Sequence, residues 1–157
     1  IVVCVHGDHI ERFGPPEEIF TNEYIHGLYG ITSGNYNADF GCLEMEPPSG
    51  EPQVFVIGGN GQGIPVYRKL QRQGIPFAVG VLHENDVDYA VAKFLAVHVI
   101  SQKPFEEVEE EQITQAKCVL LHCNKLICCL KDFGKMNRRN EELIREAEKL
   151  QIEVYFT

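Results

Sequence analysis

Residues 53–65 read Gln-Val-Phe-Val-Ile-Gly-Gly-Asn-Gly-Gln-Gly-Ile-Pro, and this stretch decides the fold. Residues 54–57 are apolar and mostly β-branched, which is typical of a buried strand. The glycine cluster that follows predicts a tight turn. Ile64 and Pro65 then predict the start of a helix, because proline lacks an N–H group and the first helical turn does not use that donor. The stretch therefore predicts a strand, a glycine turn and a helix in succession.

The residues that follow repeat this alternation. Short apolar runs between polar loops predict further strands at 76–82, 98–101, 125–130 and 153–156. Apolar residues at helical spacing predict three helices: one that ends near Gly74, one that covers 87–95, and one that follows the acidic residues 109–111. A last helix is predicted with Asn137 or Asn140 as its cap and with Leu143, Ala147 and Leu150 facing inward.

Apolar strands that alternate with helices predict a parallel sheet that is covered on both faces. We therefore expect an α/β fold with three layers, a doubly wound, Rossmann-like and mainly parallel sheet of about five strands. The expected strand order is 3-2-1-4-5. Ligands of such sheets bind beyond the carboxyl ends of the strands, where the order reverses. Here this place is formed by the loops after the first and fourth strands, with help from the loop after the second.

A ligand cleft is the main functional hypothesis from the residues. Glycines let a ligand approach bare backbone, and the N-terminus of the next helix attracts anions. Carboxylates after the second strand can accept hydrogen bonds from hydroxyls such as those of a ribose, and an amide after the fourth strand can supply donors. The candidate residues are Gly58, Gly59, Asn60, Gly61, Gln62, Glu84, Asp86 and Asn137.

The glycine cluster also has a simpler interpretation, in which it is a tight turn without any ligand. It is not a full dinucleotide fingerprint, because Ile64 stands where the third glycine belongs when the motif is counted from Gly59. The chain also lacks the Gly-x-x-x-x-Gly-Lys-Ser/Thr motif of nucleotide-hydrolysing phosphate loops. The ligand is therefore expected to be a small anionic or nucleotide-like molecule of unassigned identity.

Two weaker candidates remain open. Cys118, His122 and Cys123 could begin a metal site, although buried cysteines on an amphipathic helix explain them better, so no metal is assigned. Asp86 and Asp88 could act as paired carboxylates, but a helix cap at Asp86 explains them equally well. We assign no catalytic residues.

The composition predicts a domain boundary and argues against some classes of function. Residues 1–52 carry nine acidic residues and one basic residue, whereas residues 53–157 carry 14 acidic and 13 basic residues. Five of the eight prolines precede residue 53, so we expect a domain boundary between a tail at 1–52 and a domain at 53–157. The net charge of -9 disfavours nucleic-acid binding. The chain has no apolar run of 18 residues, so no membrane span is predicted. Its six scattered cysteines suit a reducing cytosol.

Residues 1–30, IVVCVHGDHIERFGPPEEIFTNEYIHGLYG, resemble the closing segment of ABC-transporter ATP-binding subunits. In that segment a hairpin leads into Gly-Pro-Pro-Glu-Glu-Ile-Phe-Thr and a short helix that ends in Tyr-Gly-Ile. The similarity is greatest to importers of cobalamin and ferric siderophores. Some of these subunits carry an extra C-terminal domain, which 53–157 resembles at 58–61, 80–88, 104–105 and 133–143. Since the first residue is isoleucine, we expect a C-terminal fragment of such a chain.

The resemblance implies a parent chain that uses ATP and Mg²⁺ to drive uptake of cobalamin or iron-siderophore. Its partners would be the ABC ATPase domain and the transporter permease, at the cytoplasmic face of the membrane. The hydrolytic motifs of ABC proteins are missing from this stretch, so it is not expected to turn over ATP itself. Three functions are considered: a regulatory ligand-binding domain, a docking module for another subunit or a second copy in a homodimer, and a small dinucleotide-binding enzyme.

Overall fold

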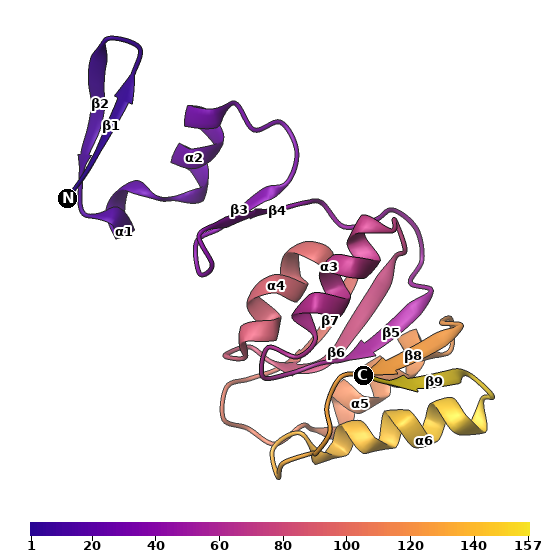
Figure 1. Ribbon diagram of the computed structural model, residues 1–157. Helices are drawn as coiled ribbons and strands as arrows, with labels where there is room; N and C mark the ends of the chain where they lie inside the picture. The colour runs from indigo at the N-terminus through magenta and orange to yellow at the C-terminus, as the bar shows by residue number, and fades with distance from the viewer. The chain divides into compact units, whose positions relative to one another are not determined.

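The computed structural model describes residues 1–157, which separate into two units, Ile1–Glu46 and Pro47–Thr157 (Figure 1). The second unit contains one sheet of five parallel strands in the order β7-β6-β5-β8-β9. The strands are β5 (Val54–Ile57), β6 (Phe77–His83), β7 (His98–Gln102), β8 (Lys125–Cys128) and β9 (Glu153–Phe156). In chain order this is 3-2-1-4-5, which confirms the expected doubly wound α/β fold.

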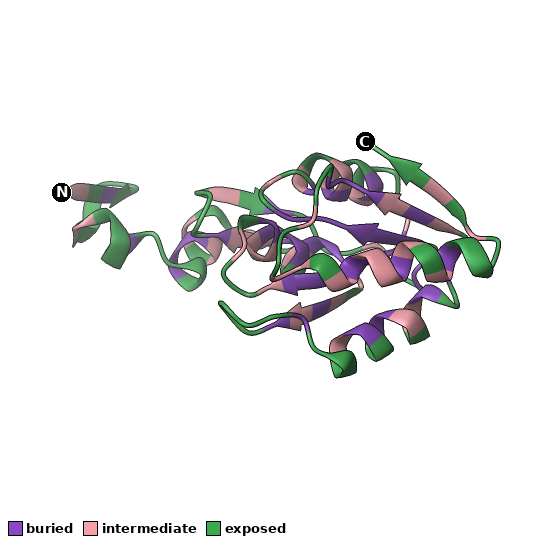
Figure 2. Cartoon of the chain, turned by 90° about the horizontal axis from the view of Figure 1, so that it is seen from below, coloured by how far each residue is buried: buried purple, intermediate pink, exposed green.

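Two helices cover each face of this sheet (Figure 1). On one face lie α3 (Ile64–Arg72) and α4 (Val87–Leu95), and on the other lie α5 (Glu110–Leu120) and α6 (Glu141–Lys149). The central strand explains both layers, because successive side chains of a strand point to opposite faces. Val54 and Val56 pack in the core with α3 and α4, whereas Phe55 and Ile57 pack in the core with α5 and α6. Figure 2 shows this buried centre and the largely exposed edge strand β9.

The cap predictions had mixed outcomes. Asp86 caps α4 as expected, because its carboxylate accepts a hydrogen bond from the Asp88 N–H at 2.9 Å. Asn140 lies at the N-cap position of α6, as predicted, but its side chain makes no capping hydrogen bond, and Asn137 lies at the start of the preceding 3-10 helix instead. Leu150 was wrongly placed in the core, since α6 ends at Lys149 and Leu150 is 38% exposed.

Asn140 instead joins the chain after β8 to β6. Its buried amide donates to the Val81 carbonyl oxygen at 3.0 Å and accepts from the Val81 N–H at 2.8 Å. Val81 lies where the register between β6 and β7 is interrupted, so these bonds replace ladder bonds that β7 does not supply. Asn140 ends the short 3-10 helix η1 (Arg138–Asn140), and its bonds fix the end of the loop that follows β8 beside β6.

The unit Ile1–Glu46 contains two hairpins and two short helices. The elements are β1 (Val2–His6), β2 (His9–Gly14), α1 (Pro16–Ile19), α2 (Asn22–Tyr29), β3 (Asn35–Asn37) and β4 (Cys42–Glu44). The first hairpin and a short helix were expected, whereas the β3–β4 hairpin was not. The small core of this unit contains Cys4, Ile19 and Tyr24. Across both units, no helix combines the length and the apolar character that a membrane span requires.

Candidate ligand-binding site

The loop between β5 and α3 has the backbone geometry that its glycines allow. Gly59 and Gly61 have φ angles of 149° and 78°, in the region that side chains rarely adopt. The Asn60 N–H donates to both carboxylate oxygens of Asp86 at 3.0 Å, and the Gln62 N–H donates to the Gly59 carbonyl oxygen at 3.0 Å. The loop is thus held against the end of β6.

Gly58 and Gly63 have a different role, which is to make room for Tyr67. A Cβ atom at either glycine would overlap the Tyr67 hydroxyl group. The Tyr67 ring is fully buried and stacks on Phe77 with ring centroids 5.8 Å apart. Its hydroxyl has no hydrogen-bond partner, and burial, followed by the nearby Asp88 carboxylate, raises the pKa of Tyr67 well above its ordinary value. Packing therefore accounts for these two glycines without a ligand.

The N-terminus of α3 is capped by a side chain from α4. The fully buried Asp88 carboxylate accepts hydrogen bonds from the N–H groups of Gly63 at 3.2 Å and Ile64 at 3.1 Å. Burial raises the pKa of Asp88, and the Gly63 N–H works against that rise. The donors that the sequence offers to an anionic ligand at this helix thus bind a carboxylate of the chain itself.

The first cavity at the strand ends, here called the glycine-loop cavity, has a volume of about 350 Å³. Its lining residues are Gly59, Asn60, Gln62, Asp86, Leu130, Lys131, Asp132 and Asn137. The structure therefore brings five of the eight candidate residues to one cavity, from the loops after β5, β6 and β8. Gly58, Gly61 and Glu84 do not line it, and the Glu84 carboxylate accepts a hydrogen bond from the Ser101 hydroxyl at 3.3 Å instead.

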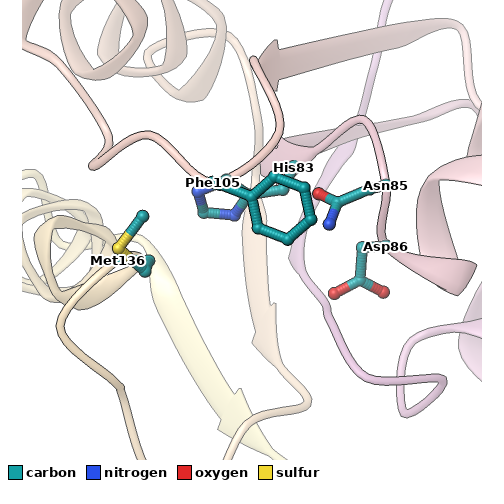
Figure 3. A pocket seen from close by; sticks show the side chains of 5 residues that line it. All are labelled: His83, Asn85, Asp86, Phe105 and Met136. Atoms are coloured by element: carbon teal, nitrogen blue, oxygen red, sulfur yellow. The ribbon is translucent and has the colours of Figure 1, made fainter.

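A second cavity, here called the Phe105 cavity, lies next to the first and has a volume of about 250 Å³. Figure 3 shows its lining, which consists of His83, Asn85, Asp86, Phe105 and Met136. Asp86 lines both cavities. Two hydrogen bonds fix the walls: His83 Nε2 donates to the Glu106 carbonyl oxygen at 2.7 Å, and the Val108 N–H donates to the Met136 carbonyl oxygen at 3.0 Å.

Phe105, Met136 and Lys131 line the two cavities but are not among the candidate residues predicted from the sequence. Met136 and Lys131 follow the fourth strand, where the strand-order rule predicts ligand contacts but does not select residues. Phe105 follows the third strand, outside the loops that this rule indicates. The Pro104-Phe105 pair predicts a turn, but a turn signal does not indicate that the Phe105 side chain lines a cavity.

The possible metal ligands belong to another part of the domain. His122 Nδ1 lies 3.0 Å from the Cys118 carbonyl oxygen, and the Cys123 thiol lies 3.5 Å from the Pro52 carbonyl oxygen. Burial raises the pKa of the Cys123 thiol to about 11, which favours the thiol over the metal-binding thiolate. No group of three or more His, Cys, Asp or Glu side chains is arranged to hold a metal ion.

Residues 77–157, a little over half of the chain, match the model of the MJ0874 family. The chain belongs to the MJ0874 family. The part that matches begins at β6, so it includes the whole lining of the Phe105 cavity, while the glycine loop precedes it.

Two relatives from Methanocaldococcus jannaschii are similar to the chain. The first is "Uncharacterized protein MJ0874", which is 28% identical over 78 residues, or 50% of this chain and 84% of the relative. The second is "Uncharacterized ABC transporter ATP-binding protein MJ0873", which is 32% identical over 71 residues, or 45% of this chain and 24% of the relative. No solved structure matches the chain. The similarity to the second relative links this MJ0874-family chain weakly to ABC transporter ATP-binding proteins.

Proposed function

We propose that residues 53–157 form an accessory, regulatory domain of an ABC importer ATP-binding subunit and that this domain binds a small ligand at the strand ends. The parent chain would couple hydrolysis of ATP, with Mg²⁺, to uptake of cobalamin or iron-siderophore. Its partners would be the ATPase domain and the permease, at the cytoplasmic face of the membrane. The observation that carries the ligand-binding role is the glycine-loop cavity, which five candidate residues line at the point where the strand order reverses.

The lining of this cavity is suited to recognition by hydrogen bonds. Gln62 and Asn137 offer amides, Lys131 offers an ammonium group, and Asp132 offers a carboxylate. Ligand sites commonly combine such a small set of polar groups with a preformed cavity. The transporter link is supported by the resemblance of residues 1–30 and by the similarity to a relative that is named as an uncharacterized ABC transporter ATP-binding protein.

A docking role is the second candidate, and the β1–β2 hairpin favours it. Val3 and Val5 pair with Phe13 and Ile10 across the hairpin, and all four side chains are exposed. An apolar strand face that its own unit leaves uncovered is typical of an interaction surface. A dinucleotide-binding enzyme is less well supported, because Asp88 accepts from the N–H groups that would otherwise hold a pyrophosphate.

A thermal-shift panel of nucleosides, nucleotides, corrinoids and siderophores tests the ligand-binding role. A ligand at 100 times its Kd stabilises the folded state by about 2.7 kcal/mol, which raises the melting temperature by several degrees. We expect at least one member of the panel to do so and Gln62→Ala to weaken its binding about tenfold. Arg145→Ala on α6 is the control, since Arg145 pairs only with Glu141 on its own helix. If no member stabilises the unmodified chain, the docking candidate replaces the ligand-binding one.

Limited proteolysis tests the proposed domain boundary. Residues 45–53 contain no helix or strand. We expect subtilisin, a protease of broad specificity, to cut first between 41 and 52 and to leave a stable fragment that retains 53–157, because exposed irregular segments are cleaved before packed ones. Trypsin is the control, since no lysine or arginine lies between Arg12 and Arg68. First cuts within the sheet region would contradict the boundary.

A further inference from the structure

We propose that the Phe105 cavity binds the planar base of a nucleoside that carries no 5′-phosphate, and that Asp86 accepts hydrogen bonds from the sugar hydroxyls. This inference rests on the proposed function, because the Phe105 cavity shares Asp86 with the glycine-loop cavity and extends the ligand site to its neighbour. It differs from the expectation drawn from the sequence, which places an anionic group over the glycine loop.

Phe105 has an unusual backbone conformation for a bulky residue. The Glu106 N–H donates to the Lys103 carbonyl oxygen at 3.4 Å, which closes a turn with Pro104 and Phe105 at its centre. Phe105 has a φ angle of 63°, and the residue after proline in a turn with positive φ is ordinarily glycine or asparagine. A bulky side chain in this region is an outlier, and such strained residues concentrate at functional sites.

The Phe105 ring contributes little burial to the fold. The side chain is 83% exposed although it lines the cavity, so burial in this chain does not offset the cost of its backbone conformation. An exposed aromatic face can stack on the planar ring of a ligand, and base stacking of this kind is common in nucleic-acid-binding proteins. The conformation and exposure of Phe105 are thus explained by a planar partner from outside the chain.

The remaining walls suit the base of a nucleoside. Met136 offers a polarisable thioether, which packs well against aromatic rings. The exposed Asn85 amide has both donors and an acceptor for the polar edge of a base. The hydrogen bond from His83 Nε2 to the Glu106 carbonyl oxygen, at 2.7 Å, fixes the orientation of the imidazole in the wall. A volume of about 250 Å³ is below the range of roughly 300–1,000 Å³ for drug-sized ligands, which fits one ring system with its sugar reaching outward.

Asp86 places the sugar between the two cavities. Its carboxylate accepts from the Asn60 and Asp88 N–H groups, and a carboxylate has about four acceptor positions, so at least one remains for a hydroxyl. A 5′-phosphate would extend from the sugar into the glycine-loop cavity. There the phosphate would face two carboxylates, those of Asp86 and Asp132, and only one lysine, Lys131. The N–H groups at the start of α3 cannot compensate, because the Asp88 carboxylate occupies them.

Calorimetric titration of the full chain tests the inference with adenosine, guanosine, cytidine and uridine. We expect at least one nucleoside to bind and its 5′-monophosphate to bind at least tenfold more weakly. Phe105→Gly should raise the Kd at least tenfold while the melting temperature stays the same or rises, because glycine tolerates the positive φ. The matched control is Gln151→Gly. Gln151 is also exposed, has a φ angle of 60°, and lies in the turn between α6 and β9. This variant should leave the Kd unchanged.

Several results would overturn the inference. One is the absence of heat from all four nucleosides, another is tighter binding of the monophosphate, and a third is wild-type affinity in Phe105→Gly. If a corrinoid or siderophore from the thermal-shift panel binds, loses affinity in Gln62→Ala and is unaffected by Phe105→Gly, the proposed function stands and the nucleoside inference fails. If nothing in either experiment binds, both fail.

Discussion

Gly58→Ala is expected to lower the free energy of unfolding by about 3 kcal/mol, at the upper end of the usual cost of overpacking a core. The new Cβ atom would overlap the Tyr67 hydroxyl, and it would lie 3.0 Å from Tyr67 Cζ and 3.2 Å from Asp88 Oδ2. Tyr67 cannot move away easily, because its ring is fully buried and stacked on Phe77. Urea denaturation followed by circular dichroism measures the change. Gly134→Ala is the control, since its Cβ would meet only Asn137 Oδ1 at 3.8 Å, and it should change stability by less than about 0.5 kcal/mol.

A double-mutant cycle with Tyr67→Phe identifies the cause of that loss. The Tyr67 hydroxyl has no hydrogen-bond partner, so its removal should leave stability within about 1 kcal/mol of the unmodified chain or raise it. In the Tyr67→Phe background, Gly58→Ala should cost at most half as much, because the overlap with the hydroxyl is gone and only Tyr67 Cζ at 3.0 Å and Asp88 Oδ2 at 3.2 Å remain close. Strictly additive effects would mean that Gly58 is required for a reason other than the Tyr67 hydroxyl.

This packing shows why the glycine cluster was only partly interpretable from the sequence. A run of glycines indicates close approach to the backbone, but it does not say what approaches. At Gly58 and Gly63 the approaching group is Tyr67 from the next helix, and at Gly59 and Gly61 the turn itself needs positive φ. The tight-turn interpretation therefore explains these four positions, whereas the cavity is lined by their neighbours Asn60 and Gln62 as well as by Gly59.

The fold was predictable because its signals are local. Each strand of the sheet is a short run between polar loops, and β5 and β6 are apolar at nearly every position because both faces are covered. The predictions failed where an interaction joins residues that are distant in the sequence. Asn140 looked like a helix cap, but its amide pairs with Val81, which lies 59 positions earlier. Strand 125–130 was predicted too long, since Cys129 and Leu130 stay buried after β8 has ended at Cys128.

The candidate site was predictable to the extent that topology determines it. The strand order places the loops after β5, β6 and β8 together, so Gly59, Asn60, Gln62, Asp86 and Asn137 line one cavity, but it does not select residues within those loops. The contacts of Asp88 with the start of α3 depend on how α4 packs beside α3, which no spacing in the sequence reveals. The same holds for Phe105, whose exposure is a property of the folded chain.

Asp88→Ala is expected to lower the free energy of unfolding by about 3–4 kcal/mol. The change leaves the buried N–H group of Gly63 and the partly buried N–H group of Ile64 without an acceptor, and a buried group that loses its partner costs about 1–3 kcal/mol. Chemical denaturation at neutral pH measures the effect. Asp132→Ala removes an exposed carboxylate at the same end of the sheet and should change stability by less than about 0.5 kcal/mol. Equal effects of the two substitutions would contradict the role of Asp88 as the cap of α3.

Asp88→Asn separates the hydrogen bonds of this carboxylate from its charge. The amide keeps the size of the side chain but has a single acceptor oxygen, so one N–H group loses its partner, at a cost of about 1–3 kcal/mol. Burial raises the pKa of Asp88 in the folded state above its unfolded value of about 3.9, so the folded chain binds this proton more tightly. The stability gained from that proton is complete below about pH 3.9 and is lost as the pH rises through the folded pKa. The free energy of unfolding of the unmodified chain should therefore exceed that of Asp88→Asn by the largest amount at low pH. This difference should shrink as the pH rises and then level off. An excess that grows with pH would show that the N–H groups of Gly63 and Ile64 outweigh burial and hold the carboxylate in its charged form.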